Sequence, residues 1–365
     1  MPLVRIRDLF LDEFETYVTG TVPRNAVIRN GDVVIGMDGD FNLAVWKRGE
    51  AALNQRLCAL RPRADVDIRF IAYALPDALH VINDLAYSTT VKHLSSLEVT
   101  GERLLLPPVE EQRRIADFLD AETDRIDRMA ESRERQLAGL SERQKSAFGE
   151  LFSGCSSGTA VRLKHLLAMR PRYGVLVPEF ADEGVPFIRV NDLLDLSGRS
   201  SNLIRIPHSL SAAYSRTQTF PGDVLVSVVG TVGRAAIVPK TLSGANVARA
   251  VALLRPQKGV SASLLVAWLG TADFEHQALL ATGTDTAQPT LGMEDLSNFA
   301  VRWPSDEHEQ QRLAVAVDEV VRWTNDVRKA ISRQLALLAE RRQALITAAV
   351  TGQIDVTTAH GADLS

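Results

Sequence analysis

A chain of 365 residues with 45% hydrophobic side chains is long enough for about two globular domains with sizeable cores. Its formal net charge of −4 argues against a strongly basic protein, and Cys58 and Cys155 form no metal motif, redox motif or disulfide framework. No apolar run of about 18 residues predicts a membrane span, and Met1–Arg5 lacks a signal-peptide pattern, so we expect a cytoplasmic protein.

The first stretch, residues 1–108, predicts a globular domain built on short strands. Alternating apolar residues over Pro2–Leu9 predict a strand that is closed by a polar Asp turn. Gly31–Gly36 is a Gly-Asp turn that leads into a β-rich run, which we interpret as a buried strand. A further apolar strand ends at Arg61-Pro62.

Residues 109–154 predict one long helix. Apolar residues recur at the steps of three, four and seven that form a helix seam, with Pro108 before the start and Gly154 at the end. The seam positions are Ile115, Leu119, Ile126, Met129 and Leu140. At about 1.5 Å per residue the helix would be roughly 65 Å long, so its seam needs a partner.

The chain then repeats itself. Glu111-Gln112 aligns with Glu309-Gln310, and the same spacing of 198 positions holds without a gap as far as Gly154 and Gly352. Residues 305–352 therefore predict a second long helix, followed by a tail over residues 353–365. Its seam positions are Leu313, Val317, Val327, Ile331, Leu338 and Leu345. Two unrelated amphipathic helices are the alternative, and the constant spacing argues against it.

The strand motifs repeat as well, which predicts a second globular domain over residues 155–304. Pro186–Leu193 resembles Pro2–Leu9, Gly222–Ser227 resembles Gly31–Gly36, and Arg255-Pro256 closes a strand as Arg61-Pro62 does. A lead-in, residues 161–184, has no counterpart before Met1. We therefore expect the first domain to be short at its N-terminus, through a lost opening strand or a start placed too far downstream.

The predicted fold is α/β (α+β). Each of two globular domains precedes a long helix, and the two helices form an antiparallel coiled coil with internal pseudo-two-fold symmetry. Such a body suits an elongated target with two separated binding sites, and DNA fits that description.

Known catalytic patterns are missing from the sequence. There is no Gly-x-x-x-x-Gly-Lys-Ser/Thr loop, no Asn/Asp-Pro-Pro-Tyr/Phe tetrapeptide and no Gly-x-Gly-x-x-Gly after a strand. Gly230–Arg234 has two glycines only, and we interpret it as a tight turn. Histidines are scattered, and the acidic pairs Glu110-Glu111 and Asp306-Glu307 stand at helix starts, where the macrodipole favours acids. We predict no catalytic residue, no metal and no cofactor for this chain.

Recognition is the remaining interpretation. Three pairs of matched loops carry Arg, Lys, Gln and Asn, the side chains that can read base edges in the major groove. The candidate DNA contacts are Asp38, Asp40, Asn42, Asn54, Gln55, Arg56, Lys92, His93, Thr231, Arg234, Arg249, Gln288 and Thr290. The acidic pair Asp38 and Asp40 suits cytosine amino groups or a purely structural turn better than phosphate. The alternative is that all of these are ordinary solvated loop residues.

In this layout the sequence resembles the specificity subunit of type I restriction–modification systems, over essentially the whole chain. The motifs are Gly-Asp-Val-Val from Gly31, Gly-Asp-Val-Leu from Gly222, Gly-Thr-Val-Gly from Gly230, and Pro-x-x-Glu-Glu-Gln ending at Gln112, which Pro304–Gln310 repeats in looser form.

The resemblance implies a non-catalytic subunit in which each globular domain reads one half of a split double-stranded DNA site. The long helices would separate the two domains and set the unread spacer. Two methyltransferase subunits and the restriction and translocase subunits would bind this chain, and they would carry the S-adenosylmethionine and ATP chemistry.

Two other classes stay open at this point. A coiled-coil interaction scaffold without DNA binding would agree with the modest charge. An enzyme of unrecognised type would need a cluster of buried ionisable groups.

Overall fold

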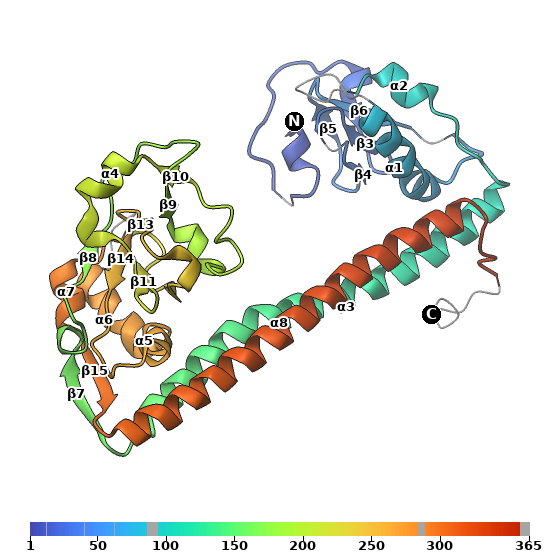
Figure 1. Cartoon of the computed structure of the whole chain (residues 1–365). Coiled ribbons are helices and arrows are strands. Elements are labelled where there is room, and N and C mark those ends of the chain that lie inside the picture. The colour runs from blue at the N-terminus through green and yellow to red at the C-terminus, as the bar shows by residue number, and fades with distance from the viewer. Residues whose placement is uncertain (12, 40, 62, 86–93, 284–288, 358–365) are drawn as a thin grey trace. The chain divides into compact units, whose positions relative to one another are not determined.

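The computed structural model describes residues 1–365 except 12, 40, 62, 86–93, 284–288 and 358–365 (Figure 1). The chain divides into two compact units. Unit 1 comprises Met1–Glu134 and Ser332–Ser365, and unit 2 comprises Arg135–Ile331. Both units therefore contain a globular part together with a portion of each of two long helices.

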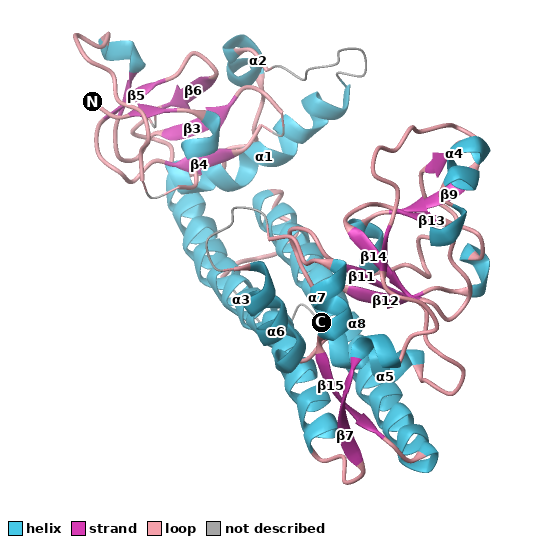
Figure 2. Ribbon diagram, turned by 90° about the vertical axis from the view of Figure 1, so that its left-hand side faces the viewer, coloured by secondary structure: helices cyan, strands magenta, loops and turns pink. Residues whose placement is uncertain are grey.

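Unit 1 contains two small sheets and two short helices beside its portions of the long helices. The sheets have strand orders β1-β5-β2 and β4-β3-β6. The elements are β1 (Leu3–Val4), β2 (Val27–Ile28), β3 (Val33–Gly36), β4 (Leu43–Val45), β5 (Ala51–Leu53), β6 (Leu57–Leu60), α1 (Ile68–Leu85) and α2 (Ser96–Gly101). Helix α1 covers β3, because Leu75 and Leu79 share one buried cluster with Val33 and Ile35 (Figure 2).

Unit 2 contains three sheets, with strand orders β10-β9-β13, β12-β11-β14-β8 and β15-β7. Its strands are β7 (Gly158–Arg162), β8 (Arg172–Tyr173), β9 (Val185–Ile188), β10 (Arg205–Ile206), β11 (Val224–Ser227), β12 (Ala235–Ile237), β13 (Asn246–Val247), β14 (Val251–Leu254) and β15 (Ala300–Pro304). Its shorter helices are α4 (His208–Ala213), α5 (Ala262–Leu269), α6 (Ala272–Thr282) and α7 (Met293–Asn298).

The strand pairing in the two units matches. β3 lies antiparallel between β4 and β6, and β11 lies antiparallel between β12 and β14. β1 pairs with β5 in parallel, as β9 does with β13. The predicted strands after Gly31 and Gly222 are fully buried, and those that end before Arg61 and Arg255 are present. The predicted repeat of these strands is therefore confirmed. The strands predicted over Pro2–Leu9 and Pro186–Leu193 are shorter than expected, because Ile6–Asp8 and Val190–Leu194 form 3-10 helices.

The units differ at two strands, β7 and β8, that precede the repeated part of unit 2. β8 extends the central sheet, and β7 pairs with β15 over its whole length (Figure 2). Residues 102–106, which precede α3 as β15 precedes α8, form no strand. Leu105 is 83% exposed there, whereas Trp303 of β15 is 4% exposed beside β7. The stretch before the long helix is thus part of a sheet in unit 2 and mostly exposed in unit 1.

The long helices are α3 (Val109–Ser153) and α8 (Glu307–Val350), within two residues of the predicted bounds. Gly352 follows α8 with φ of 72°, a conformation that favours glycine at a helix end. No helix in the described part of the chain is both long and apolar enough to cross a bilayer.

The predicted seam residues mostly lie inside the protein. In unit 1, Ile115, Leu119 and Ile126 of α3 share a buried cluster with Leu345 of α8 and with α1. In unit 2, Phe148 and Phe152 of α3 share a cluster with α8, including its residues Leu313 and Val317. The other predicted seam positions vary: Leu140 and Ile331 are buried, Val327 and Leu338 are half-buried, and Met129 is 39% exposed.

Candidate nucleic-acid interface

Two of the predicted loops and residue Leu94 meet at one edge of unit 1. The turns β3–β4 and β5–β6 lie at the same end of the sheet, because Gly36 pairs with Leu57. The backbone N–H of Met37 donates to the carbonyl oxygen of Arg56 (2.9 Å), and that of Leu94 donates to the carbonyl oxygen of Met37 (2.7 Å). These bonds bring together two of the predicted loops and the residue that follows the third.

Unit 2 repeats this edge. Val228 donates its N–H to the carbonyl oxygen of Ala250 (2.9 Å), and Leu291 donates to the carbonyl oxygen of Val228 (2.8 Å). At the base of the turn, Ser227 donates to Arg234 (2.8 Å), as Gly36 donates to Asn42 (2.8 Å) in unit 1. The described loops after β3 and β11, and the residues Arg56 and Ala250 to which they bond, are thus equivalent in structure, as are Leu94 and Leu291.

The side chains on the two edges differ. In unit 1 the guanidinium of Arg56 forms an ion pair with the carboxylate of Asp38, and Asn54 Oδ1 accepts the backbone N–H of Arg56 (3.1 Å). The side chain of Arg56 is 60% exposed and that of Asp38 is 16% exposed. This ion pair fits the interpretation of Asp38 as part of a structural turn, and a contact of Asp38 with DNA stays a prediction. Asn42 and Gln55 are exposed.

In unit 2 the corresponding turn is compact. Ser227 Oγ donates to the carbonyl oxygen of Thr231 (2.5 Å) and accepts the N–H of Arg234 (2.9 Å). Gly230 and Gly233 both have positive φ, 73° and 94°, as the predicted tight turn requires. Among the candidates here, Thr231, Arg249 and Thr290 are exposed and Arg234 is half-buried. The candidates Asp40, Lys92, His93 and Gln288 lie outside the described residues.

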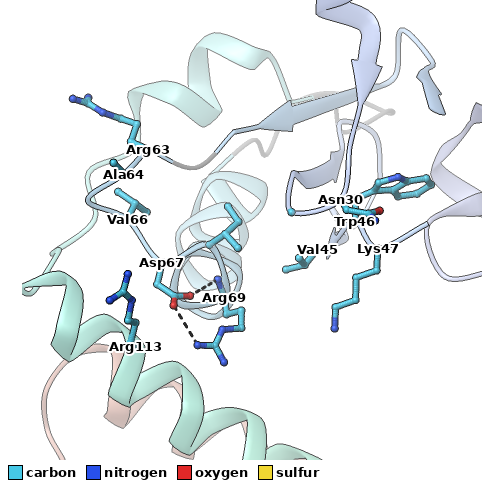
Figure 3. A pocket seen from close by; sticks show the side chains of 12 residues that line it. Asn30, Val45, Trp46, Lys47, Arg63, Ala64, Val66, Asp67, Arg69 and Arg113 are labelled. Carbon is cyan, nitrogen blue, oxygen red and sulfur yellow. Dashed lines mark hydrogen bonds and ion pairs between the residues drawn. The ribbon is translucent and has the colours of Figure 1, made fainter. Parts of the chain in front are cut away.

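A cavity of about 610 Å³ in unit 1 carries basic groups that the sequence analysis did not single out (Figure 3). Its lining includes Lys47, Arg63, Arg69 and Arg113. Figure 3 shows Asp67 bound to Arg69, which also pairs with Asp117 and Asp120 of α3 at 2.8 Å each.

These carboxylates raise the pKa of Arg69, chiefly through the hydrogen bond with Asp117. The neighbouring carboxylates therefore offset the positive charge of Arg69. The ion pairs of Arg69 with Asp117 and Asp120 connect α1 to α3. The cavity includes Asn30 and Gly31, which precede β3, so it lies at the opposite end of the sheet from the β3–β4 turn. No short motif marks this cluster, because its members are spread from residue 30 to residue 113.

Near the start of α8, the carboxyl group of Glu309 has a lowered pKa. The carboxylate of Glu309 accepts N–H bonds from Ser156 and Ser157 (3.0 Å each) and bonds from both hydroxyl groups. The Ser157 hydroxyl is the main reason why the pKa of Glu309 falls to about 2, against the opposing effect of burial. A carboxylate held in its ionised form binds the Ser156–Ser157 turn to the start of α8 and does not suit proton transfer at neutral pH.

Within the described residues no three His, Cys, Asp or Glu side chains are grouped so as to hold a metal ion. The two edges are instead a pair of similar scaffolds that carry different polar side chains, an arrangement typical of recognition.

Comparisons with known proteins agree with a role in recognition. A family model described as the type I restriction modification DNA specificity domain matches residues 16–137. The type I restriction enzyme EcoBI specificity subunit of Escherichia coli is 30% identical over an alignment 385 residues long. The alignment covers 97% of this chain and 80% of that protein. A solved chain, reported under complex assembly and conformational transition of the type I R-M system, has a similar fold: the TM-score is 0.68 at 22% identity, over 91% of this chain and 85% of the other.

This chain belongs to the family of type I restriction enzyme specificity subunits. It is a non-catalytic subunit for DNA-sequence recognition, so the predicted family, role and lack of an enzymatic activity of its own are confirmed by these relationships.

Proposed function

We propose that this chain reads a DNA site in two halves, one with each globular domain, and positions methyltransferase and nuclease subunits around it. The observation that carries the proposal is the repeated edge: Leu94 bonds to Met37 as Leu291 bonds to Val228. Equal scaffolds with unequal side chains are what a reader of an asymmetric two-part site needs, because base edges are distinguished by side-chain chemistry.

The proposed domains are residues 1–108 and 155–304, each followed by a long helix over 109–154 and 305–352, with a tail from residue 353. We propose that α3 and α8 form an antiparallel coiled coil with pseudo-two-fold symmetry that sets the spacer between the half-sites. Two local contacts support this. The start of α3, at Ile115, shares a cluster with the end of α8 at Leu345, and the end of α3, at Phe152, shares one with Leu313 near the start of α8.

The proposed DNA contacts are the polar residues at the two edges. Their exposure supports the assignment in unit 1 for Asn42, Gln55 and Arg56, and in unit 2 for Thr231, Arg249 and Thr290. Arg, Gln and Asn offer donors to guanine and adenine, and threonine can bond to a base edge through its hydroxyl group or contact the thymine methyl group through its own methyl group.

The proposed partners are double-stranded DNA, two methyltransferase subunits and the restriction and translocase subunits. Because such a complex acts on cellular DNA, we place it in the cytoplasm. The chemistry, with its cofactors, would belong to those partners and not to this chain.

The test is co-expression with a methyltransferase subunit of a type I system that forms a stable complex with this chain, followed by modification-sensitive sequencing of the host DNA. The expected result is one methylated motif in two defined halves, together with duplex affinity that falls steeply with added salt. A stable complex that methylates no motif and binds no DNA would overturn the proposal in favour of an interaction scaffold. A motif with a single defined half would mean that only one domain reads DNA.

A further inference from the structure

The ion pair of Arg56 with Asp38 occupies the junction of two turns at the edge of unit 1. Asp38 follows the central strand β3, and Arg56 ends the β5–β6 turn. The backbone of Arg56 is bound on both sides: its N–H donates to Asn54 Oδ1 (3.1 Å), and its carbonyl oxygen accepts from Met37 (2.9 Å).

The common scaffold does not require this ion pair. The repeated hydrogen bonds make Met37 equivalent to Val228 and Arg56 equivalent to Ala250. The position matching Asp38 is therefore Val229, so unit 2 builds the same edge with two apolar residues. The ion pair is present in unit 1 and has no equivalent in unit 2, although both units have the same scaffold at this edge. It is therefore better explained by what unit 1 recognises in DNA than by the stability of the fold.

The chemistry of the pair points to a base. Guanine presents two acceptors, O6 and N7, to the major groove, and the planar guanidinium can donate to both at once. Arg56 Nη1 binds Asp38, and among the described residues the other guanidinium donors have no partner. A carboxylate that holds one end of the group reduces the conformational freedom lost on binding.

We propose that Arg56 reads a guanine in the half-site of unit 1 and that Asp38 is the residue that positions it. This inference rests on the proposed function and adds the base and the residue that recognises it. Asp38 itself need not contact DNA, since its side chain is 16% exposed whereas that of Arg56 is 60% exposed.

The test uses the full chain co-expressed with the methyltransferase subunit, with the methylated motif determined for each variant. In Arg56→Ala, one guanine of one half-site is expected to become any base, and affinity for the original duplex should fall about tenfold to 100-fold. Arg56→Lys keeps the charge but not the paired donors, so it should also lose the preference for guanine. Asp38→Asn should weaken the preference by a smaller factor without changing the salt dependence of binding.

Arg249→Ala is the matched control, because it changes an exposed arginine at the edge of unit 2 and should leave the unit 1 half-site unaltered. An unchanged motif in both Arg56 variants would overturn the inference. So would a uniform loss of affinity for every duplex, which would assign Arg56 to phosphate. If the unmodified complex methylates no motif, the proposed function fails first, and that outcome is distinct from both of these.

Discussion

The guanidinium of Arg255 binds the carboxylate of Asp223 through two hydrogen bonds, from Nε and Nη2, each 2.8 Å long. Asp223 is 2% exposed and also accepts the backbone N–H of Phe220 (2.7 Å). In unit 1, Asp32 accepts from Arg29 in the same way, while Arg61 lies 3.5 Å from it. The Gly-Asp motifs therefore have a structural purpose: the carboxylate closes the turn before the central strand and binds the arginine that ends its neighbour.

Removal of Arg255 should destabilise unit 2 strongly. Arg255→Ala leaves the buried carboxylate of Asp223 without its counter-ion, which we expect to lower the free energy of unfolding by about 3 kcal/mol. The measurement is urea unfolding followed by tryptophan fluorescence. That signal reports mainly on unit 2, where three of the four tryptophans lie, at Trp268, Trp303 and Trp323.

Arg61→Ala is the control for that change; because three of the four tryptophans lie in unit 2, the two variants are compared by urea unfolding followed by circular dichroism. The Arg61 side chain is 53% exposed and its ion pair is longer, so we expect a loss of about 1 kcal/mol or less. Equal losses in the free energy of unfolding of the two variants would show that the buried ion pair of Asp223 adds no more stability than the more exposed ion pair of Asp32.

Much of this fold follows from the sequence because local periodicity carries it. The seven-residue recurrence of apolar positions is enough to predict α3 and α8, and the Gly-Asp turns mark the central strands. Matched loops could be paired because the motifs occur in the same order in both halves.

Pairings over long range were not predictable in this way. Residues 102–106 precede α3 as β15 precedes α8, yet only β15 forms a strand, because it pairs with the distant β7 of unit 2. The Asp38–Arg56 ion pair joins residues 18 positions apart on two turns, and no periodic pattern indicates it. Whether a loop side chain is bound to a neighbour or exposed depends on the packing of the turns and not on residue type.

The stability of unit 2 should depend on acid through Glu309. Its pKa lies near 2 in the folded chain, below the ordinary value of 4.5. The ionised group therefore stabilises the fold fully above about pH 4.5, and this contribution is lost as the pH falls from there toward 2. We expect Glu309→Gln to unfold at lower urea than the unmodified chain at pH 7, with a smaller difference at pH 3.

The matched control for Glu309 is Glu111→Gln at the start of α3. Glu111 binds Arg114 at the surface, so its replacement should change the urea midpoint little at either pH. A difference between Glu309→Gln and the unmodified chain that stays constant from pH 7 to pH 3 would contradict the assignment.

Gly174 should tolerate no side chain. A Cβ at this buried position would overlap the carbonyl oxygen of Val247, to which the next residue, Val175, donates its N–H (2.8 Å). Backbone cannot yield as a flexible side chain can, so Gly174→Ala should cost about 3 kcal/mol or more. Gly139→Ala is the opposite case, because a Cβ there meets nothing within 4 Å inside helix α3.

We expect Gly139→Ala to raise stability by about 0.5–1 kcal/mol through helix propensity. Both glycine variants can be compared by thermal unfolding followed by circular dichroism. A neutral Gly174→Ala would show that the lead-in segment can move away from β13.

The last prediction concerns buried and exposed positions along the seam of α3. Leu119 is fully buried in unit 1, in the cluster that joins α3, α8 and α1, whereas Met129, ten residues further along α3, is 39% exposed. Leu119→Ala should lower the free energy of unfolding by about 3 kcal/mol, because it leaves a cavity among side chains from three helices. Met129→Ala should cost well under about 1 kcal/mol, since water already reaches that side chain. Urea unfolding followed by circular dichroism at the helix signal measures both. If Met129→Ala keeps its stability but loses affinity for the methyltransferase subunit, the exposed surface of α3 binds that partner while the buried seam stabilises the fold. Equal losses of stability in Leu119→Ala and Met129→Ala would contradict the buried seam.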